Sequence, residues 1–158
     1  MQQEVSELNQ LEGVFVAASR AMVAIAAKSF ASVENQVTLN QYRVLIILLS
    51  EGSAPPSVLS KRMGLKPYII TRLCDHLLQN RLIVRKSSEL DRRKIELSVT
   101  PQGKKLVSKV INSRRKILKE LAEFIPMDKR SSVSDAFRYF TEISSNVFEE
   151  KFLNLWVL

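Results

Sequence analysis

The sequence contains few residues that make turns or cross-links. Its 158 residues include four glycines, five prolines and one cysteine, Cys74. One cysteine excludes an internal disulfide, and so little glycine and proline favours long helices over a fold with many turns. The hydrophobic share of 46% and the charged share of 25% are typical of a folded globular protein. The length suits one domain, residues 1–158.

The residue patterns of common enzymes and metal sites are also missing. There is no glycine-rich phosphate loop, no H-E-x-x-H motif and no nucleophile elbow. The single histidine, His76, has no cysteine, histidine or carboxylate near it at metal-ligand spacing. We therefore expect neither an enzyme nor a site for a metal or cofactor.

Long apolar runs are absent as well. The longest runs, residues 21–27 and 44–49, are far shorter than the ~18 residues that a membrane-spanning helix needs. The first residues, Met1 to Glu4, are polar and acidic, unlike the basic start of a signal peptide. The sequence therefore predicts a cytoplasmic protein that has no membrane partner.

Positive charge is concentrated in the middle of the chain. Residues 61–119 hold 17 Lys and Arg against four acidic residues, a local charge of +13, whereas the remainder carries −5. A segment this basic attracts polyanions and predicts salt-dependent binding to phosphate backbones. A solvated surface without a nucleic-acid partner is the alternative that charge alone leaves open.

Helical periodicity dominates the first half of the sequence. Residues 4–31 repeat apolar side chains at steps of three and four, which predicts one amphipathic helix. Thr38 is a candidate N-cap for a second helix that ends near residue 51. A short third helix follows Pro55 and stops at Gly64, and Pro67 can open a fourth. A short helix, a tight turn and a longer helix form a helix-turn-helix motif.

The next segment predicts a β-hairpin. Residues 82–85 are a short stretch with β-branched Ile83 and Val84, and residues 94–99 alternate between polar and apolar side chains. The charged residues 86–93 between them are too many for a tight turn and would project as a wing. Thr100 and Pro101 then open a long helix that ends near Pro126, and a last helix starts at about residue 128.

These elements define the predicted fold. It is mainly α with a small β-hairpin wing: a winged helix-turn-helix lobe at residues 38–100, with dimerisation helices at residues 1–31 and 101–158. The long terminal helices carry more apolar surface than one small lobe can cover, which indicates a homodimer. Its predicted interface residues are Leu8, Phe15, Phe137, Phe140, Phe148, Phe152, Leu155 and Trp156.

Two stretches resemble the MarR family (multiple antibiotic resistance regulators). They are residues 70–77, ITRLCDHL, and residues 91–103, DRRKIELSVTPQG, which contain a D-x-R motif, an alternating strand and a T-x-x-G motif. The resemblance implies a homodimeric winged-helix repressor, sometimes an activator, that binds pseudo-palindromic operators in double-stranded DNA. It also implies an effector pocket, because a small phenolic or other lipophilic ligand often releases such proteins from DNA. No residue of this sequence identifies that ligand.

The fourth helix supplies the first set of candidate DNA-binding residues. The side opposite its apolar stripe carries Tyr68, Thr71 and Arg72, with Lys66 just before the helix. Arg72 can bind guanine O6 and N7 or a phosphate, and both remain open. Thr71 can contact a base edge or a phosphate, and Tyr68 a thymine methyl group or a phosphate.

The wing supplies the second set. Arg93 stands at the arginine of the D-x-R motif, which the resemblance places in the minor groove, with Asp91 holding it in position. Arg92 and Lys94 are expected to contact phosphates. An Asp91–Arg93 pair that only stabilises the hairpin is the alternative.

Three positions depart from the family pattern. Tyr68 replaces a small hydroxyl residue, Lys66 replaces the Ser or Asp that often begins the recognition helix, and Arg81 replaces a glycine. Without that glycine, Asn80 or Arg81 must adopt a left-handed conformation, for which Asn80 is the better candidate. Cys74 is expected to be a buried apolar thiol rather than a redox sensor.

The sequence therefore predicts a dimeric, sequence-specific transcription regulator. Two recognition helices related by a two-fold axis would lie about 10 base pairs apart on DNA. A sequence-independent architectural protein that binds only the backbone, and a winged helix used for protein interactions, are the alternatives.

Overall fold

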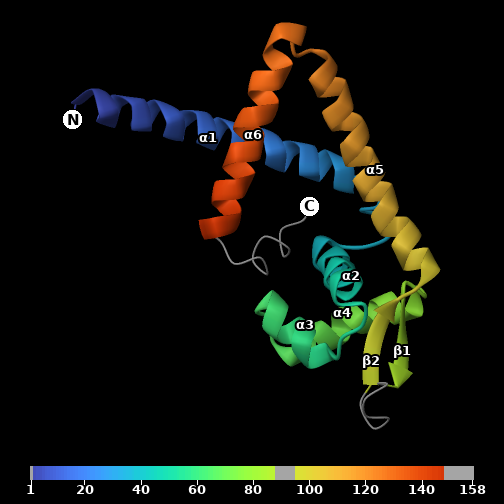
Figure 1. Ribbon diagram of the computed structural model, residues 1–158. Helices are drawn as coiled ribbons and strands as arrows, with labels where there is room; N and C mark the ends of the chain where they lie inside the picture. The colour runs from blue at the N-terminus through green and yellow to red at the C-terminus, as the bar shows by residue number, and fades with distance from the viewer. Residues whose placement is uncertain (1, 88–94, 148–158) are drawn as a thin grey trace.

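The computed structural model describes residues 2–87 and 95–147 (Figure 1). The element order is α1 (Gln2–Phe30), α2 (Leu39–Glu51), α3 (Pro56–Met63), α4 (Pro67–Gln79), β1 (Ile83–Ser87), β2 (Ile95–Val99), α5 (Pro101–Glu123) and α6 (Met127–Val147). The two strands pair antiparallel, with Ile83 opposite Val99 and Ser87 opposite Ile95. The mainly helical fold with one hairpin is confirmed.

The helices begin and end where the local chemistry predicts. The Thr38 hydroxyl accepts a hydrogen bond from the Gln41 backbone N–H, and the Gln41 side chain accepts one in return from the Thr38 N–H, a capping box at the start of α2. Thr100 caps α5 by accepting from the Gly103 N–H at 3.1 Å. Gly64 ends α3 at φ 65°, in the left-handed region that glycine adopts at low cost.

The hydrophobic core lies in the winged lobe. Its largest fully buried side chains are Tyr42, Leu45, Leu48, Leu59, Ile70, Leu77 and Leu97, from α2, α3, α4 and β2. Ala54 exchanges two backbone hydrogen bonds with Leu97, which ties the loop before α3 to the hairpin. The first turns of α5 close the core through Leu106, Val107 and Val110. This packing fixes α4 and the hairpin relative to each other.

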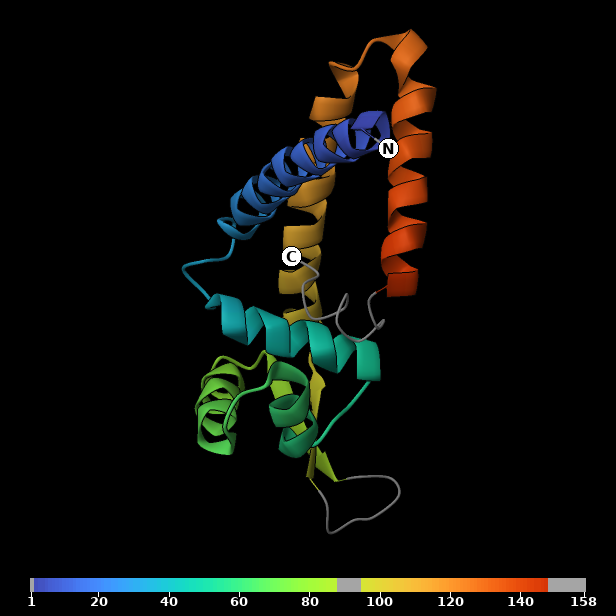
Figure 2. The same ribbon diagram turned by 90° about the vertical axis from the view of Figure 1, so that its left-hand side faces the viewer.

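The remaining helices form an arm above the lobe. α5 rises from the hairpin, α6 returns from its top, and α1 crosses this pair (Figures 1 and 2). Phe15 of α1 and Phe140 of α6 pack together with ring centroids 4.9 Å apart. They border an apolar groove of about 450 Å³ that is also lined by Val14, Met22 and Phe137.

Most of the arm's apolar surface is uncovered in one chain. Phe15, Phe137 and Phe140 are each more than 40% exposed, and Leu8 is 61% exposed. Residues 127–145 of α6 include no buried side chain. The predicted interface residues Phe148, Phe152, Leu155 and Trp156 lie outside the described residues. Apolar helices this exposed require a partner in water.

Helix α1 corrects one expectation drawn from apolar runs. Residues Val5–Phe30 together are long and apolar enough to cross a membrane, although no single uninterrupted run is. The same helix carries Glu7, Glu12, Arg20 and Lys28, and each charge facing lipid is costly. Part of α1 also packs against α5. These features favour a protein partner for the apolar face of α1.

The turn from α4 to β1 contains a strained residue. Arg81 has φ 56°, whereas Asn80 has φ −85°, so the expectation that Asn80 would be left-handed is wrong. The Arg81 N–H donates to Leu78 O at 3.0 Å and the Leu82 N–H to Leu77 O at 2.9 Å, the two bonds of a Schellman motif. In that motif the left-handed residue is the first one past the helix cap, which here is Arg81.

Arg81→Gly is therefore expected to stabilise the protein by about 0.5–1 kcal/mol. A left-handed L-residue costs about 1–2 kcal/mol, and the greater freedom of glycine in the unfolded chain offsets part of the gain. Urea unfolding of both proteins measures the difference. Asn80→Gly is the matched control and should be destabilising, because Asn80 already has an ordinary φ. Stabilisation by the Asn80 variant instead would contradict this account.

Candidate DNA-binding site

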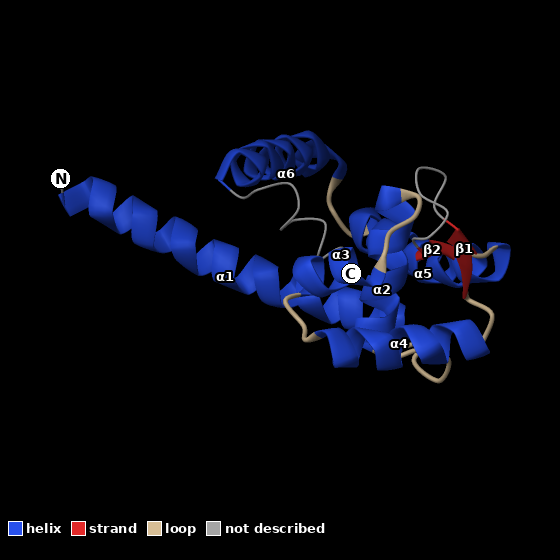
Figure 3. Ribbon diagram, turned by 90° about the horizontal axis from the view of Figure 1, so that it is seen from below, coloured by secondary structure: helices blue, strands red, loops and turns tan. Residues whose placement is uncertain are grey.

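Helix α4 is held by one side and exposed on the other. Ile70, Cys74 and Leu77 are buried in the core, and Leu73 is partly buried against it, which confirms the apolar stripe. Tyr68 is 62% exposed, and Thr71 and Arg72 are also exposed. Seen from below, α4 and the hairpin form the lower face of the lobe (Figure 3). The four predicted recognition residues, Lys66, Tyr68, Thr71 and Arg72, all have exposed side chains.

Three polar side chains near this face already have partners. The Thr71 hydroxyl donates to Pro67 O at 3.1 Å, which leaves its oxygen free to accept. Arg85 of β1 donates to Asp75 of α4 at 3.3 Å, and both side chains are about half exposed. This pair joins the recognition helix to the hairpin, and its contribution to stability is small at such exposure. The sequence analysis did not predict the Asp75–Arg85 ion pair. The only signal for it in the sequence is that the two residues carry opposite charges.

The wing candidates lie outside the described residues. Asp91, Arg92, Arg93 and Lys94 fall within residues 88–94, so their roles stay predictions. The described base of the hairpin runs beside α4 and ends at Ser87 and Ile95.

Cys74 is an unreactive thiol in this setting. It is 4% exposed, and burial raises its pKa to about 11, with the negative charge of Asp75 adding to the rise and Arg85 opposing it. A thiol must be deprotonated to react as a nucleophile. The expectation of a buried apolar thiol is confirmed.

We expect alkylation of Cys74 by iodoacetamide at pH 8 to be far slower in the native protein than in urea. The raised pKa also sets the sign of a pH effect on stability. Cys74 contributes a constant amount to the free energy of unfolding below the ordinary thiol pKa of 9.0. This contribution is lost as the pH rises towards 11, because in that range the thiol ionises readily only in the unfolded chain. The difference in unfolding free energy between wild type and Cys74→Ala, measured from pH 7 to 11, isolates it. A native alkylation rate equal to the unfolded one would contradict the burial argument.

The junction between lobe and arm contains a phenol and a guanidinium. Burial raises the pKa of Tyr42, and the nearby Arg114 charge opposes that rise. Burial lowers the pKa of Arg114, and Tyr42 acts against this. The Arg114 Nε atom is buried and has no hydrogen-bond partner among the described residues. Tyr42 on α2 and Arg114 on α5 thus place an unsatisfied donor where the two parts of the fold meet.

No metal site appears in the described ranges. Within residues 2–87 and 95–147, no three His, Cys, Asp or Glu side chains gather as they would around a metal ion. Nearby Lys61 is exposed, and Arg62 forms an ion pair with Glu51. The chemistry of the exposed face of α4 is therefore that of cationic and hydrogen-bonding groups.

The fold and this face define a winged helix-turn-helix protein. A family model described as the MarR family matches residues 37–95, the region of α2 to the hairpin. The HTH-type transcriptional repressor MdtR of Bacillus subtilis is 37% identical over 95 residues, which are 60% of this chain and 61% of MdtR. The chain thus spans about three fifths of that curated relative.

Solved structures cover more of the chain. RV1404 from Mycobacterium tuberculosis is 30% identical and has a TM-score of 0.75, over 85% of this chain and 92% of that protein. The transcriptional regulator Tm0710 from Thermotoga maritima has a TM-score of 0.78 over 88% of this chain and 99% of its own, at 19% identity, which shows the fold alone. The chain belongs to the MarR family of winged-helix transcriptional regulators. That family is non-enzymatic.

Proposed function

We propose that the chain is a sequence-specific transcriptional regulator that acts as a homodimer on a pseudo-palindromic operator. The observation that carries this proposal is the exposed side of α4, where Lys66, Tyr68, Thr71 and Arg72 all have exposed side chains, on a helix that also contacts β1 of the hairpin. A helix in this position fits the major groove of B-DNA. The printed name of MdtR supports repression as the direction of control. Regulation of transcription would take place in the cytoplasm.

Each recognition residue has a role that matches its chemistry. Arg72 offers a planar fork that can bind guanine O6 and N7. Lys66 at the start of α4 suits a phosphate, and Tyr68 suits a thymine methyl group or a phosphate. Arg93 of the wing is proposed to enter the minor groove, positioned by Asp91, while Arg92 and Lys94 contact phosphates.

Homodimerisation is supported by the uncovered arm. The exposed apolar side chains of α1 and α6 would be buried between two copies, with Leu8, Phe15, Phe137 and Phe140 among them. The last residues of the chain, including Phe148, Phe152, Leu155 and Trp156, are proposed to extend the same interface. A two-fold axis through it would separate the recognition helices by about one turn of DNA.

The effector is proposed to bind at the junction of lobe and arm. A small phenolic or lipophilic acid would find the apolar surroundings of Tyr42 and the unpartnered Nε donor of Arg114. Occupancy there could change the separation of the two lobes of the dimer and hence the fit to DNA. No single compound is favoured by these residues.

Selection of bound fragments from the source organism's sheared DNA tests the proposal. At physiological salt, the best fragment should bind at least ~1000-fold more tightly than scrambled competitor and give a palindromic footprint. An architectural protein would show little preference, since backbone contacts carry no sequence information. Little preference without added ligand would therefore reject sequence-specific regulation.

Arg72→Ala should weaken operator binding by about 1–3 kcal/mol if Arg72 reads a base. On the natural operator, Arg72→Ala should lose most of this affinity. On operators in which the base pair read by Arg72 is changed in each half-site, the wild type and the variant should bind with similar affinity. Binding isotherms for the operator and for its single base-pair variants measure this. Arg138→Ala on the exposed side of α6 serves as a control for the loss of one positive charge. Equal weakening on every sequence would make Arg72 a phosphate contact instead.

A further inference from the structure

We propose that the outer side of α5 is a second DNA-binding surface, which binds the phosphate backbone of duplex DNA outside the operator. The surface consists of Lys105, Lys109, Lys116 and Lys119, called the basic strip below. It lies on a different helix from the predicted recognition residues of α4. The inference rests on the proposed function, because it assumes a duplex held below α4.

Helical spacing places the four lysines on one side of α5. Steps of four, seven and three residues return to the same side of an α-helix, and the strip spans about 21 Å along its axis. Leu106, Val107 and Val110 are buried on the opposite side, and all four lysines are exposed. The strip therefore faces away from the core of its own chain.

The charges of the strip are not neutralised within the chain. Across the described residues, none of the four lysines forms an ion pair. The residues between them on this side, Ser108 and Asn112, are polar and uncharged. Glu120 and Glu123 lie one helical turn beyond Lys116 and Lys119, without an ion pair to them in the described part of the chain. Four unpaired charges over this length produce a positive potential that attracts a linear polyanion.

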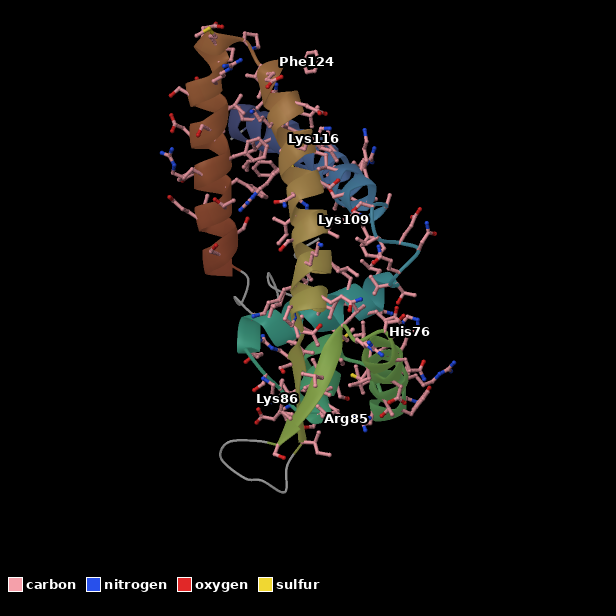
Figure 4. The ribbon with its side chains drawn as sticks, turned by 90° about the vertical axis from the view of Figure 1, so that its right-hand side faces the viewer. His76, Arg85, Lys86, Lys109, Lys116 and Phe124 are labelled. Atoms are coloured by element: carbon pink, nitrogen blue, oxygen red, sulfur yellow. The ribbon has the colours of Figure 1, made fainter. Side chains whose placement is uncertain are left out.

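The strip lies above the described base of the hairpin (Figure 4). Figure 4 shows Lys109 and Lys116 on α5 above Arg85 and Lys86 of β1, on the same side of the molecule. Lys116 lies about 22 Å along α5 from its first residue, so a straight duplex below α4 would not reach it. DNA that leaves the operator past the wing and bends towards the arm would meet these side chains in order.

The chemistry of the strip favours DNA over an acidic protein. Protein interfaces are depleted of lysine and depend on aromatic or apolar anchors in their centre. This side of α5 presents lysines and small polar residues, and no apolar side chain lies between Lys105 and Lys119 on it. Lysine contacts phosphate as a flexible point charge, so a backbone can be bound without sequence preference.

The experiment compares a short duplex that contains only the operator with a long one that adds about 20 base pairs on each side. The wild-type dimer should bind the long duplex at least ~10-fold more tightly at low salt. With the strips of both protomers engaged, eight lysines per dimer, the slope of log affinity against log salt should be steeper by about 7 for the long duplex. Lys109→Glu/Lys116→Glu should remove both differences, while Lys109→Arg/Lys116→Arg should keep them.

A second arm distinguishes the source of the phosphate backbone. A fluorescent duplex without an operator is added to protein saturated with the short operator duplex, and energy transfer between the two duplexes is measured. Energy transfer that Lys109→Glu/Lys116→Glu abolishes would show that the strip binds a second duplex. A preference for the long duplex without energy transfer would show that the strip binds the DNA that flanks the operator. Equal affinity for both lengths and no energy transfer would overturn the inference and leave a solvated surface or an acidic protein partner. Failure of the wild type to prefer the short operator duplex over scrambled DNA would instead overturn the proposed function.

Discussion

Phe140→Asp is expected to separate the dimer and to weaken binding to a two-half-site operator by at least ~100-fold. Phe140 packs against Phe15 with the rings tilted by 57° and lines the groove between α1 and α6, yet 43% of its surface is still exposed in one chain. A carboxylate there would be buried without a partner when two copies meet, which is costly. Each monomer would then bind one half-site, and the avidity of about 10²- to 10⁴-fold that linked sites provide would be lost.

Sedimentation equilibrium and operator titration measure the two effects on the same preparation. Tyr139→Asp is the matched control, because Tyr139 is the neighbouring residue on α6, is 67% exposed and does not line the groove. It should remain dimeric and should keep its operator affinity. Circular dichroism verifies that the winged lobe of both variants is folded. A Phe140→Asp protein that stays dimeric at micromolar concentration would show that the interface lies elsewhere.

The elements of the fold follow from short-range chemistry. Residues that start or end a helix interact only with neighbours a few positions away in the sequence, so the sequence predicts where these helices begin or end. Here they are Thr38 with Gln41, Gly64, Pro67 and Thr100. The period-two alternation of residues 94–99 likewise predicts the strand, although burial in β2 does not alternate, because Leu97 and Ser98 are both buried and Ile95 is exposed. These signals can be recognised in the sequence because they involve residues only a few positions apart.

Pairings between elements were less predictable. The Phe15–Phe140 contact joins residues 125 positions apart, and the periodicity of α1 and α6 indicates only that each has an apolar side. Both residues were predicted as contacts between copies, but in one chain they contact each other. The Asp75–Arg85 pair is similar, because several opposite charges lay within reach in the sequence. Only the tertiary arrangement of the helices and strands determines which of several chemically equivalent residues become partners.

The left-handed residue shows the same limit on a smaller scale. Residue type alone favours Asn80, since asparagine tolerates that conformation better than arginine. The Asn80 side chain instead donates to His76 O at 2.8 Å, while the backbone bonds of the helix end assign the left-handed position to Arg81. The requirement to bring Leu82 back against the core therefore outweighs the preference of an individual residue.

Gly103→Ala is expected to destabilise the protein by about 3 kcal/mol, near the upper end of the usual cost of overfilling a packed site. A Cβ atom at Gly103 would lie 2.2 Å from the backbone oxygen of Leu82 and 2.6 Å from Val99 Cγ1. The Leu82 oxygen cannot move freely, since it accepts from the Thr100 N–H at 3.0 Å and lies 3.1 Å from the Thr100 hydroxyl. Relief of the clash would disturb the junction of α4, β1 and α5.

Thermal and urea unfolding should show this loss, as a midpoint lowered by roughly 6–12 °C for a chain of this size. Gly13→Ala is the matched control, because no atom lies within 4 Å of the added Cβ and the residue is inside α1. The same substitution there should raise stability by about 0.5–1 kcal/mol through helix propensity. If both variants had the same stability as the wild type, the close contact of Gly103 with Leu82 and Val99 would not limit the size of the residue at this position. Opposite signs would show that steric contact, and not the loss of glycine itself, determines the cost.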